Sequence, residues 1–319
     1  MLKKIAENIR QNDNIIEKKD IKPIVQFINE KSFKSQRIFS DIGEDSAAVK
    51  NDGKFILMTT DRIKTSFIEN FPFGAGFSSI LVGIDDIYCC GGIPLAASVI
   101  LSFSDRSKGT EIIKGICEGS HKFRVPIIRG HTNTSSQYYE LSTTMIGEIK
   151  KEDYISAKNA RVNDDIVFVS DFDGKVGKAS NLYWDTVTFK STKEVLKKRM
   201  SMNVIAEKHL AHASKDISNG GIFGTILQLI KYSNVGANVN ITKITIPKTL
   251  IDLKYSLETF IKMYLTTSYI LTAPKNNSNQ IIDIFHKHGL HANVIGTIIK
   301  ETNLLRINDG KESIDVIKF

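Results

Sequence analysis

Apolar residues at helical spacing open the chain. Leu2, Ile5 and Ile9 recur every three or four residues, which predicts a short helix. A second such pattern covers residues 21–28, with Asp20 as its cap and a proline in its first turn. The chain is therefore expected to begin with two short helices.

A β-hairpin is predicted next. Strand-like runs cover residues 45–49 and 54–61, and the Asn-Asp-Gly segment at 51–53 between them is typical of a tight hairpin turn. This arrangement places Asp45 and Asp61 at the outer ends of one hairpin.

A longer helix follows the hairpin. Apolar residues between 77 and 87 trace one helical face, and a Gly-Gly pair followed by Pro94 ends the pattern. Asp85 and Asp86 lie in its last turns, where the negative end of the helix dipole disfavours a carboxylate by about 0.3–1 kcal/mol. A nearby cation is the simplest group that would compensate this cost.

The remaining patterns mix strands and helices without strict alternation. We expect strands at 95–103, 125–130 and 140–149, a helix at 110–123 and a polar loop at 131–137. A polar stretch at 150–165 predicts a boundary between one domain at 1–150 and another at 151–319. The second half predicts strands at 166–172, 236–246, 268–273 and 291–299, and helices at 192–213 and 222–232. Such a mixture indicates α+β domains over a doubly wound parallel sheet.

Composition agrees with a cytoplasmic protein of two domains. The 319 residues are 41% apolar, enough for a substantial core, and domains average roughly 150 residues. No apolar run approaches the roughly 20 residues that a membrane span needs. The three cysteines, Cys89, Cys90 and Cys117, match neither a disulfide framework nor a zinc spacing, so we expect buried, reduced thiols.

The charge of the chain does not select a partner. Its net charge is +8, but the lysines are spread along the sequence and no basic cluster alternates with aromatic residues. Nucleic-acid binding is therefore not expected, whereas an anionic nucleotide would suit this charge.

Candidate chemistry rests on carboxylates at turns. The chain has neither a Walker A loop nor a G-x-G-x-x-G loop leading into a helix. Acidic residues stand instead at Asp45, at Asp61 and at Asp85 and Asp86. Magnesium takes one or two carboxylates together with phosphate oxygens, so separate loops can jointly hold a metal-nucleotide complex. Each acid could equally be a cap or turn residue, and spacing alone leaves both interpretations open.

Other polar residues favour structural roles. His209 and His212 lie three apart with no third ligand in register, so we assign them no metal. Cys89 and Cys90 suit a buried position in a packed helix more than a nucleophilic one. Trp184 could line a pocket, and core packing is at least as good an interpretation.

Five segments in order resemble one enzyme superfamily. The segments lie within residues 42–226 and read IGEDSAAV, FILMTTD, VGIDDIYCCGGIP, IIRGHTN and KDISNGGIFGTI. They are similar to motifs of the superfamily that contains aminoimidazole ribonucleotide (AIR) synthetase, thiamine-monophosphate kinase, selenophosphate synthetase and the hydrogenase-maturation protein that dehydrates a carbamoyl group. AKNARVNDDIVFVSDFDGKVG and GLHANVIGTI resemble parts of the second domain, so the likeness covers most of the chain.

The resemblance implies a two-domain α+β AIR synthase-like fold whose N-terminal strands form a barrel across a homodimer, with ATP and magnesium bound along the subunit junction. The metal ligands it implies are Asp45, Asp61 and Asp86. The nucleotide-binding residues it implies are Thr59, Thr60, Gly130, His131, Thr132, Asn133, Asp216 and Asn219.

Differences from the family motifs indicate which branch of the superfamily this chain resembles. His131 stands where the kinases have an aspartate, and Asn219 replaces the second aspartate of their D-x-S-D-G motif, which puts the number of metal ligands in question. The first 40 residues contain no cysteine and the chain ends DVIKF, unlike selenophosphate synthetase and the maturation protein. The best match is the branch described only as related to AIR synthetase.

Three functions follow from this resemblance. The first is an ATP-dependent phosphotransferase or ATP-activating synthetase that acts on a small metabolite. The second is a nucleotide-binding maturation or partner protein without turnover of its own, and the third is a scaffold that has lost ATP binding. The sequence identifies neither the acceptor nor a general base.

Overall fold

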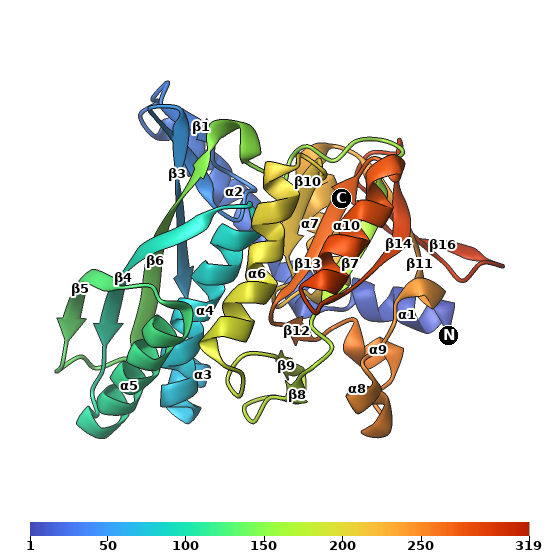
Figure 1. The fold of residues 1–319 in the computed structure, drawn as a ribbon. Helices are drawn as coiled ribbons and strands as arrows, with labels where there is room; N and C mark the ends of the chain where they lie inside the picture. The colour runs from blue at the N-terminus through green and yellow to red at the C-terminus, as the bar shows by residue number, and fades with distance from the viewer. Residues whose placement is uncertain (319) are drawn as a thin grey trace.

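Two mixed β-sheets, one from each half of the chain, form the framework of the protein (Figure 1). The structure is a computed structural model that describes residues 1–318, and the side chains at 18–20 and 22 lie outside the description. Within the described residues, every helix is too short or too polar to span a bilayer.

The first sheet has six strands in the order β1-β2-β3-β6-β4-β5. Only the β4–β5 pair is parallel. The strands are β1 (Ile38–Ser40), β2 (Ala47–Asn51), β3 (Lys54–Arg62), β4 (Ile93–Ser102), β5 (Ile127–Asn133) and β6 (Glu140–Lys150). Helices α3 (Thr65–Asn70), α4 (Pro72–Cys89) and α5 (Arg106–Phe123) lie on one side of this sheet (Figure 1).

The second sheet has seven strands in the order β10-β13-β7-β14-β11-β15-β16, and a small third sheet has the order β12-β9-β8. The strands are β7 (Asp165–Ser170), β8 (Lys175–Val176), β9 (Tyr183–Asp185), β10 (Ala213–Asp216), β11 (Gly236–Asn240), β12 (Tyr264–Leu265), β13 (Ser268–Ala273), β14 (His291–Ile299), β15 (Leu304–Asn308) and β16 (Ser313–Lys318). The helices of this half are α6 (Thr192–Glu207), α7 (Gly221–Ser233), α8 (Lys248–Asp252), α9 (Leu257–Phe260) and α10 (Lys275–Lys287), with single 3₁₀ turns at Lys151–Asp153 and Ile241–Lys243.

One hydrophobic core joins the two halves. Strand β7 is buried on both faces, and its alternate residues enter different cores. Val167 and Val169 belong to the core that also contains residues of α4, α5 and α6, whereas Ile166 and Phe168 belong to a second core under α7. Helix α6 stands between the sheets (Figure 1), so the halves are packed against each other along a continuous apolar interface.

The hairpin prediction is confirmed. Strands β2 and β3 pair from Ala47 opposite Met58 to Asn51 opposite Lys54. Asp52 and Gly53 both have positive φ, 41° and 81°, as a tight I′-type turn requires. The turn fixes the register of the hairpin, so that the start of β2, next to Asp45, lies beside the end of β3, which contains Asp61.

Several predicted boundaries are wrong. Helix α2 runs over Asp13–Lys31 with Asn12 as its cap, so Asp20 is no cap, and the proline at 23 lies inside the helix. Helix α6 ends at Glu207 rather than 213, because the segment after it turns into β10. The predicted loop at 131–137 begins as part of strand β5.

Helix α1 (Leu2–Arg10) belongs spatially to the second half. Leu2, Ile5 and Ile9 are buried in the core that contains α7 and β11. The side chain of Arg10 donates hydrogen bonds to the carbonyls of Val316 and Asp315 in β16. The N-terminal helix thereby packs against the last strand of the chain.

The first sheet is open in the single chain. Strands β1 and β5 form its two edges, so no closed barrel is present within the described residues. On the side away from α4 and α5, large apolar side chains are exposed, namely Met58, Ile93, Leu95, Ile100 and Ile128. This uncovered face is called the open sheet face below.

Candidate functional site at the junction of the two halves

A cavity of about 910 Å³ lies where the two halves meet. Its wall combines polar residues with apolar ones such as Ile63, Phe67 and Leu81. Residues from β3, α3 and α4 form one side, and residues around β9, β10, α7 and β12 form the other. Its volume is at the upper end of the range of small-molecule sites, roughly 300–1,000 Å³.

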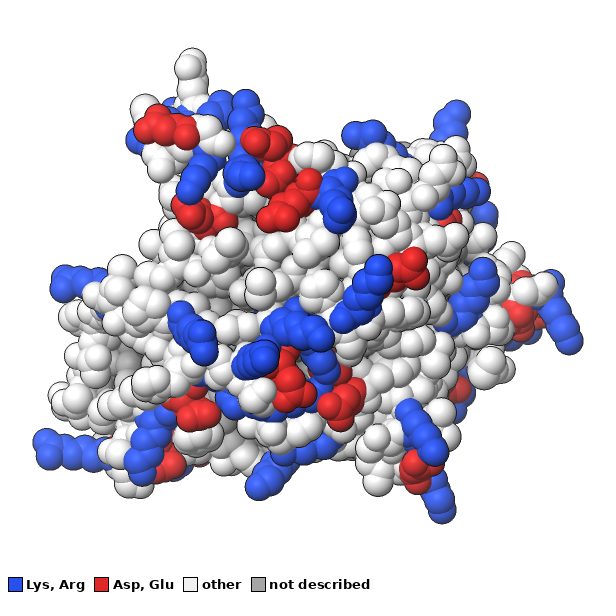
Figure 2. Space-filling model, viewed as in Figure 1, with Lys and Arg blue, Asp and Glu red and all other residues white. Residues whose placement is uncertain are grey.

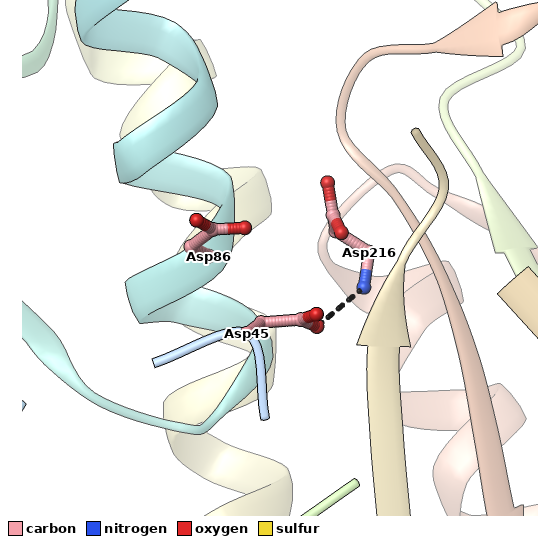
Figure 3. Close-up of side chains that lie close together, drawn as sticks. All are labelled: Asp45, Asp86 and Asp216. Atoms are coloured by element: carbon pink, nitrogen blue, oxygen red, sulfur yellow. Dashed lines mark hydrogen bonds between the residues drawn. The ribbon is translucent and has the colours of Figure 1, made fainter. Parts of the chain in front are cut away.

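Three carboxylates converge in this cavity (Figure 3). Asp45 precedes β2, Asp86 lies in α4 and Asp216 ends β10. One oxygen of each lies within 4.8 Å of the others. Since Asp216 comes from the second half, the cluster exists only when the two halves are packed together.

Thr59 links a fourth carboxylate to this cluster. Its hydroxyl donates to Asp86 and lies 3.3 Å from an oxygen of Asp61. Thr59 and Asp61 are on the same strand and two residues apart, so both side chains point to the α4 side of the sheet. The strand thereby places Asp61 beside Asp86.

Asp45 is held from three directions. The backbone N–H of Asp216 donates to its carboxylate at 3.2 Å, and the thiol of Cys89 donates at 2.9 Å. The ammonium group of Lys215 forms an ion pair with its other oxygen. These contacts fix the orientation of Asp45 across the junction.

Crowding and burial raise the pKa of three of these carboxyl groups, those of Asp61, Asp86 and Asp216. Burial is the main cause of a pKa well above the usual value at Asp86 and Asp216, and negative neighbours raise both further. The pKa of Asp61 is also raised, mainly by burial, while hydrogen bonds to Asp86 and Thr59 oppose the shift. The cluster therefore favours protons or cations among its oxygens.

Asp85 has a different role from Asp86. Its carboxylate accepts a 2.8 Å hydrogen bond from Arg199 of α6, and both side chains are buried. The sequence predicted that a cation compensates the carboxylates near the negative end of the α4 dipole. At Asp85 this cation is the guanidinium group of Arg199 in α6. This ion pair lies in the core between the two halves.

Most residues implied by the family motifs lie around this one cavity. Its lining includes Asp45, Thr59, Thr60, Asp61, Asp86, Asp216 and Asn219. The cavity lining does not include the other four residues, Gly130, His131, Thr132 and Asn133. They lie on edge strand β5, and strands β6 and β4 stand between β5 and β3. Adjacent strands are about 4.8 Å apart, so β5 lies about 14 Å from β3 in the same chain.

Sequence reasoning missed several lining residues. Lys215 was not singled out, although a lysine directly before Asp216 in a buried strand was a visible signal. Tyr183 and Tyr264 line the cavity with their rings stacked 5.6 Å apart. They come from separate short strands, and no local pattern connects them.

The residues given structural interpretations lie outside the cavity lining. Trp184 is fully buried, and its indole N–H donates to the carbonyl of Asp171 at 2.8 Å, which supports core packing. Cys89 and Cys90 are buried free thiols, whereas Cys117 is exposed, contrary to expectation. His212 does not lie on a helix and contacts Asp164 at 2.9 Å.

The donor set fits a hard divalent cation. Magnesium prefers carboxylate oxygens and keeps several waters, and Asp45, Asp86 and Asp216 offer oxygens close enough to share one ion. Two unit charges 4 Å apart repel by about 4 kcal/mol at an effective dielectric constant of ~20. This is a large part of a typical folding free energy of about 5–15 kcal/mol, so neutralisation of these charges is a strong requirement.

The face of the molecule drawn in Figure 2 has no comparable concentration of one charge. On the face drawn in Figure 2, Lys and Arg lie interspersed with Asp and Glu, and wide uncharged areas separate them. The net charge of +8 is thus distributed on this face, unlike the acidic cavity.

Two mixed sheets packed on a common core, with carboxylates from both halves at their junction, define a two-domain α+β protein with an acidic ligand cavity. Residues 43–149 match the family model described as AIR synthase related protein, N-terminal domain, and residues 174–305 match that of the C-terminal domain. The chain belongs to the AIR synthase related protein family.

Sequence similarity to known proteins covers the whole chain. An uncharacterized protein of Methanocaldococcus jannaschii is 36% identical and covers 100% of this chain and 97% of its own length. A thiamine-monophosphate kinase of Buchnera aphidicola is 27% identical over 66% of this chain and 68% of its own.

A solved structure of Thermotoga maritima PurL complexed with ATP has the same fold. It superposes with a TM-score of 0.72 at 16% sequence identity, over 88% of this chain and 47% of that one. This chain therefore spans about half the length of PurL. The likeness confirms the two-domain AIR synthase-like fold.

The carboxylate crowding predicts an unusual stability effect. Groups with raised pKa values bind more protons when folded than when unfolded, so their contribution to the free energy of unfolding falls as pH rises above about 4. In EDTA at pH 7.5, Asp86→Asn should therefore stabilise the protein by about 1 kcal/mol, or ~2–4 °C in melting temperature. Thermal unfolding measures this shift.

The exposed Asp252 in α8 supplies the control. Asp252→Asn removes the same charge outside the cavity and should leave the melting temperature unchanged. At pH 4 the advantage of Asp86→Asn should shrink. A lower melting temperature for Asp86→Asn at pH 7.5 would show that repulsion among these carboxylates does not limit the stability of the protein.

Proposed function

We propose that this chain is an ATP- and magnesium-dependent phosphotransferase or ATP-activating synthetase that acts on a small metabolite. The observation that carries the proposal is the convergence of Asp45, Asp86 and Asp216 from both halves on one cavity. The names of relatives support it, since they include a thiamine-monophosphate kinase and a PurL complexed with ATP.

Asp45, Asp86 and Asp216 would hold the magnesium ion, with Asp61 beside them. Bound magnesium supplies charge neutralisation at phosphate oxygens, which phosphoryl transfer requires. Thr59 and Thr60 line the same cavity, but only the Thr59 side chain points to the α4 side of the sheet, because the Thr60 hydroxyl pairs with that of Thr144 in β6. Thr59 in β3 donates a hydrogen bond to Asp86 in α4. This contact would orient Asp86 as a metal ligand.

The nucleoside has an apolar wall available within the same cavity. Ile63, Phe67, Phe71, Leu81 and Val82 line it, and a purine ring gains from burial against such side chains. Asn70 and Ser78 also line the cavity and can exchange hydrogen bonds with a base. The chain thus offers separate polar and apolar surfaces for the two ends of ATP.

A homodimer is part of this proposal. The open sheet face is apolar, and on it Ile100 of β4 is the register partner of His131 in β5. A second copy packed on this face would cover both residues and pair the strands of two sheets into the barrel that the family resemblance implies. Because β5 is remote from the carboxylates within one chain, Gly130, His131, Thr132 and Asn133 could reach a nucleotide only across such a junction.

Calorimetric titration with a non-hydrolysable ATP analogue tests the nucleotide site. The wild-type protein should bind the analogue only in the presence of magnesium. Asp45→Asn, Asp86→Asn and Asp216→Asn should each weaken binding at least tenfold, about 1.4 kcal/mol, because each removes a metal ligand. Asp252→Asn should bind like the wild type.

Three other outcomes would refute parts of the proposal. No binding by the folded wild-type protein would remove ATP from it. Binding that is unaffected by magnesium and by all three substitutions would place the nucleotide elsewhere. Magnesium-dependent binding of the analogue, together with no ADP release from ATP itself in the presence of candidate acceptors, would favour a nucleotide-binding partner protein over an enzyme.

The dimer is tested by substitutions on the open sheet face. Sedimentation velocity should give the wild type twice the 35.7 kDa mass of the chain. Met58→Asp and Ile100→Asp place a charge in an apolar interface and should yield monomers. Ile251→Asp alters an isoleucine that is 56% exposed in α8, so it should remain dimeric. A monomeric wild type, or dimers in all variants, would contradict the proposed interface.

A further inference from the structure

The one basic side chain bonded to the carboxylate cluster is Lys215. Its residue is only 4% exposed, and its ammonium forms an ion pair with Asp45. The cavity also has Arg62, Lys64 and Lys262 in its lining. Among the described residues, however, Lys215 alone of all Lys and Arg is ion-paired with any of the four carboxylates.

Lys215 also connects the two halves of the molecule. It lies on β10 of the second sheet, in register with Ile270 of β13, whereas Asp45 precedes β2 of the first sheet. The next residue, Asp216, donates its backbone N–H to the same carboxylate and contributes its own to the cluster. Strand β10 thus brings one positive and one negative side chain to the same place.

The position of the ammonium conflicts with full use of Asp45 as a metal ligand. Lys215 contacts Oδ1 of Asp45, and Cys89 and the Asp216 backbone contact Oδ2. A divalent cation that takes Asp45 therefore approaches a carboxylate that already accepts three hydrogen bonds, one of them from an ammonium group. Two cations cannot both approach one carboxylate oxygen closely without strong repulsion, so Lys215 and the metal compete.

We propose that Lys215 is an internal counter-ion that exchanges partners. It neutralises the carboxylate cluster in the absence of metal, and it leaves Asp45 for a nucleotide phosphate when a divalent cation binds. Buried lysine is suited to this exchange because its ammonium is a compact charge on a flexible stem with three rotatable donors. Preorganised positive charge aimed at phosphate oxygens is also what phosphoryl transfer uses.

This inference rests in part on the proposed function, because its second step needs a bound nucleotide. The first step concerns the divalent cation alone and can be measured without any nucleotide. The two steps also predict effects of opposite sign for one substitution. A general loss of folding cannot produce a gain and a loss together.

The test is Lys215→Met, which keeps the length of the side chain and removes its charge. Titration with Mn²⁺ alone, followed by electron paramagnetic resonance of the free ion, should show at least tenfold tighter binding than the wild type. Titration with a non-hydrolysable ATP analogue at saturating Mn²⁺ should show at least tenfold weaker binding. The control for the metal titration is Lys262→Met, which removes a positive charge from the same cavity and should change Mn²⁺ affinity less than threefold.

Folding is followed in the same samples by thermal unfolding. Lys215→Met should melt below the wild type in EDTA and should gain more in melting temperature from Mn²⁺ than the wild type gains. Lys215→Gln, which keeps hydrogen-bonding capacity, should behave in the same way if charge is the cause. These shifts remain measurable if the substituted protein is only partly folded without metal.

The outcomes separate this inference from the proposed function. If the wild type binds the Mn²⁺-nucleotide complex but Lys215→Met binds Mn²⁺ no more tightly than the wild type, the counter-ion role is wrong and the function stands. A second outcome is that Lys215→Met binds Mn²⁺ more tightly but neither it nor the wild type binds nucleotide. The counter-ion role at the cluster then stands, whereas the transfer to phosphate and the proposed function are both wrong. Weaker Mn²⁺ binding by Lys215→Met would overturn the inference outright.

Discussion

Mutual repulsion between crowded, partly buried carboxylates is the constraint on which the site depends. Asp45, Asp86 and Asp216 place oxygens within 4.8 Å of one another, and Asp61 lies beside them through Thr59. In a partly buried cavity such proximity is unfavourable unless protons or cations are present. The surrounding contacts reduce this cost, through the ammonium of Lys215, the thiol of Cys89 and a backbone N–H at Asp216.

The packing of the two halves is what enforces this arrangement. Asp86 is on α4, which packs against the first sheet, and Asp216 is on β10 of the second sheet. The shared core around α6 and the buried Asp85–Arg199 pair hold these elements together. Breaking one partner of a buried ion pair is strongly destabilising, by roughly 3–5 kcal/mol. The acidic site is therefore positioned by interactions that do not themselves touch the ligand cavity.

Local patterns predicted the parts of the fold that short-range physics determines. The helical period over residues 77–87 indicated α4 and placed Asp86 on it, and the Asn-Asp-Gly turn indicated the β2–β3 hairpin. Boundaries failed where tertiary contacts decide. Helix α6 ends early because residues 213–216 pair with β13, and α2 continues through a proline from a cap at Asn12.

The candidate site was predictable from the sequence in its carboxylates and in Thr59, Thr60 and Asn219, which line the same cavity. The family motifs pointed to Asp45, Asp61, Asp86 and Asp216, each next to a recognisable segment. The Tyr183–Tyr264 pair enters the cavity through long-range pairing of β9 with β12, which no local sequence signal encodes, whereas Lys215 directly precedes the predicted site residue Asp216. Residues 130–133 lie on the far edge strand of the first sheet, so within the single chain they are remote from the carboxylates.

The most direct test of the central claim is a crystal structure grown with MnCl₂ and a non-hydrolysable ATP analogue, with anomalous scattering recorded at the manganese edge. The account predicts an anomalous peak bonded to oxygens of Asp45, Asp86 and Asp216, with the triphosphate in contact with it in the junction cavity. A well-diffracting crystal in which manganese and nucleotide bind away from these three carboxylates would contradict it.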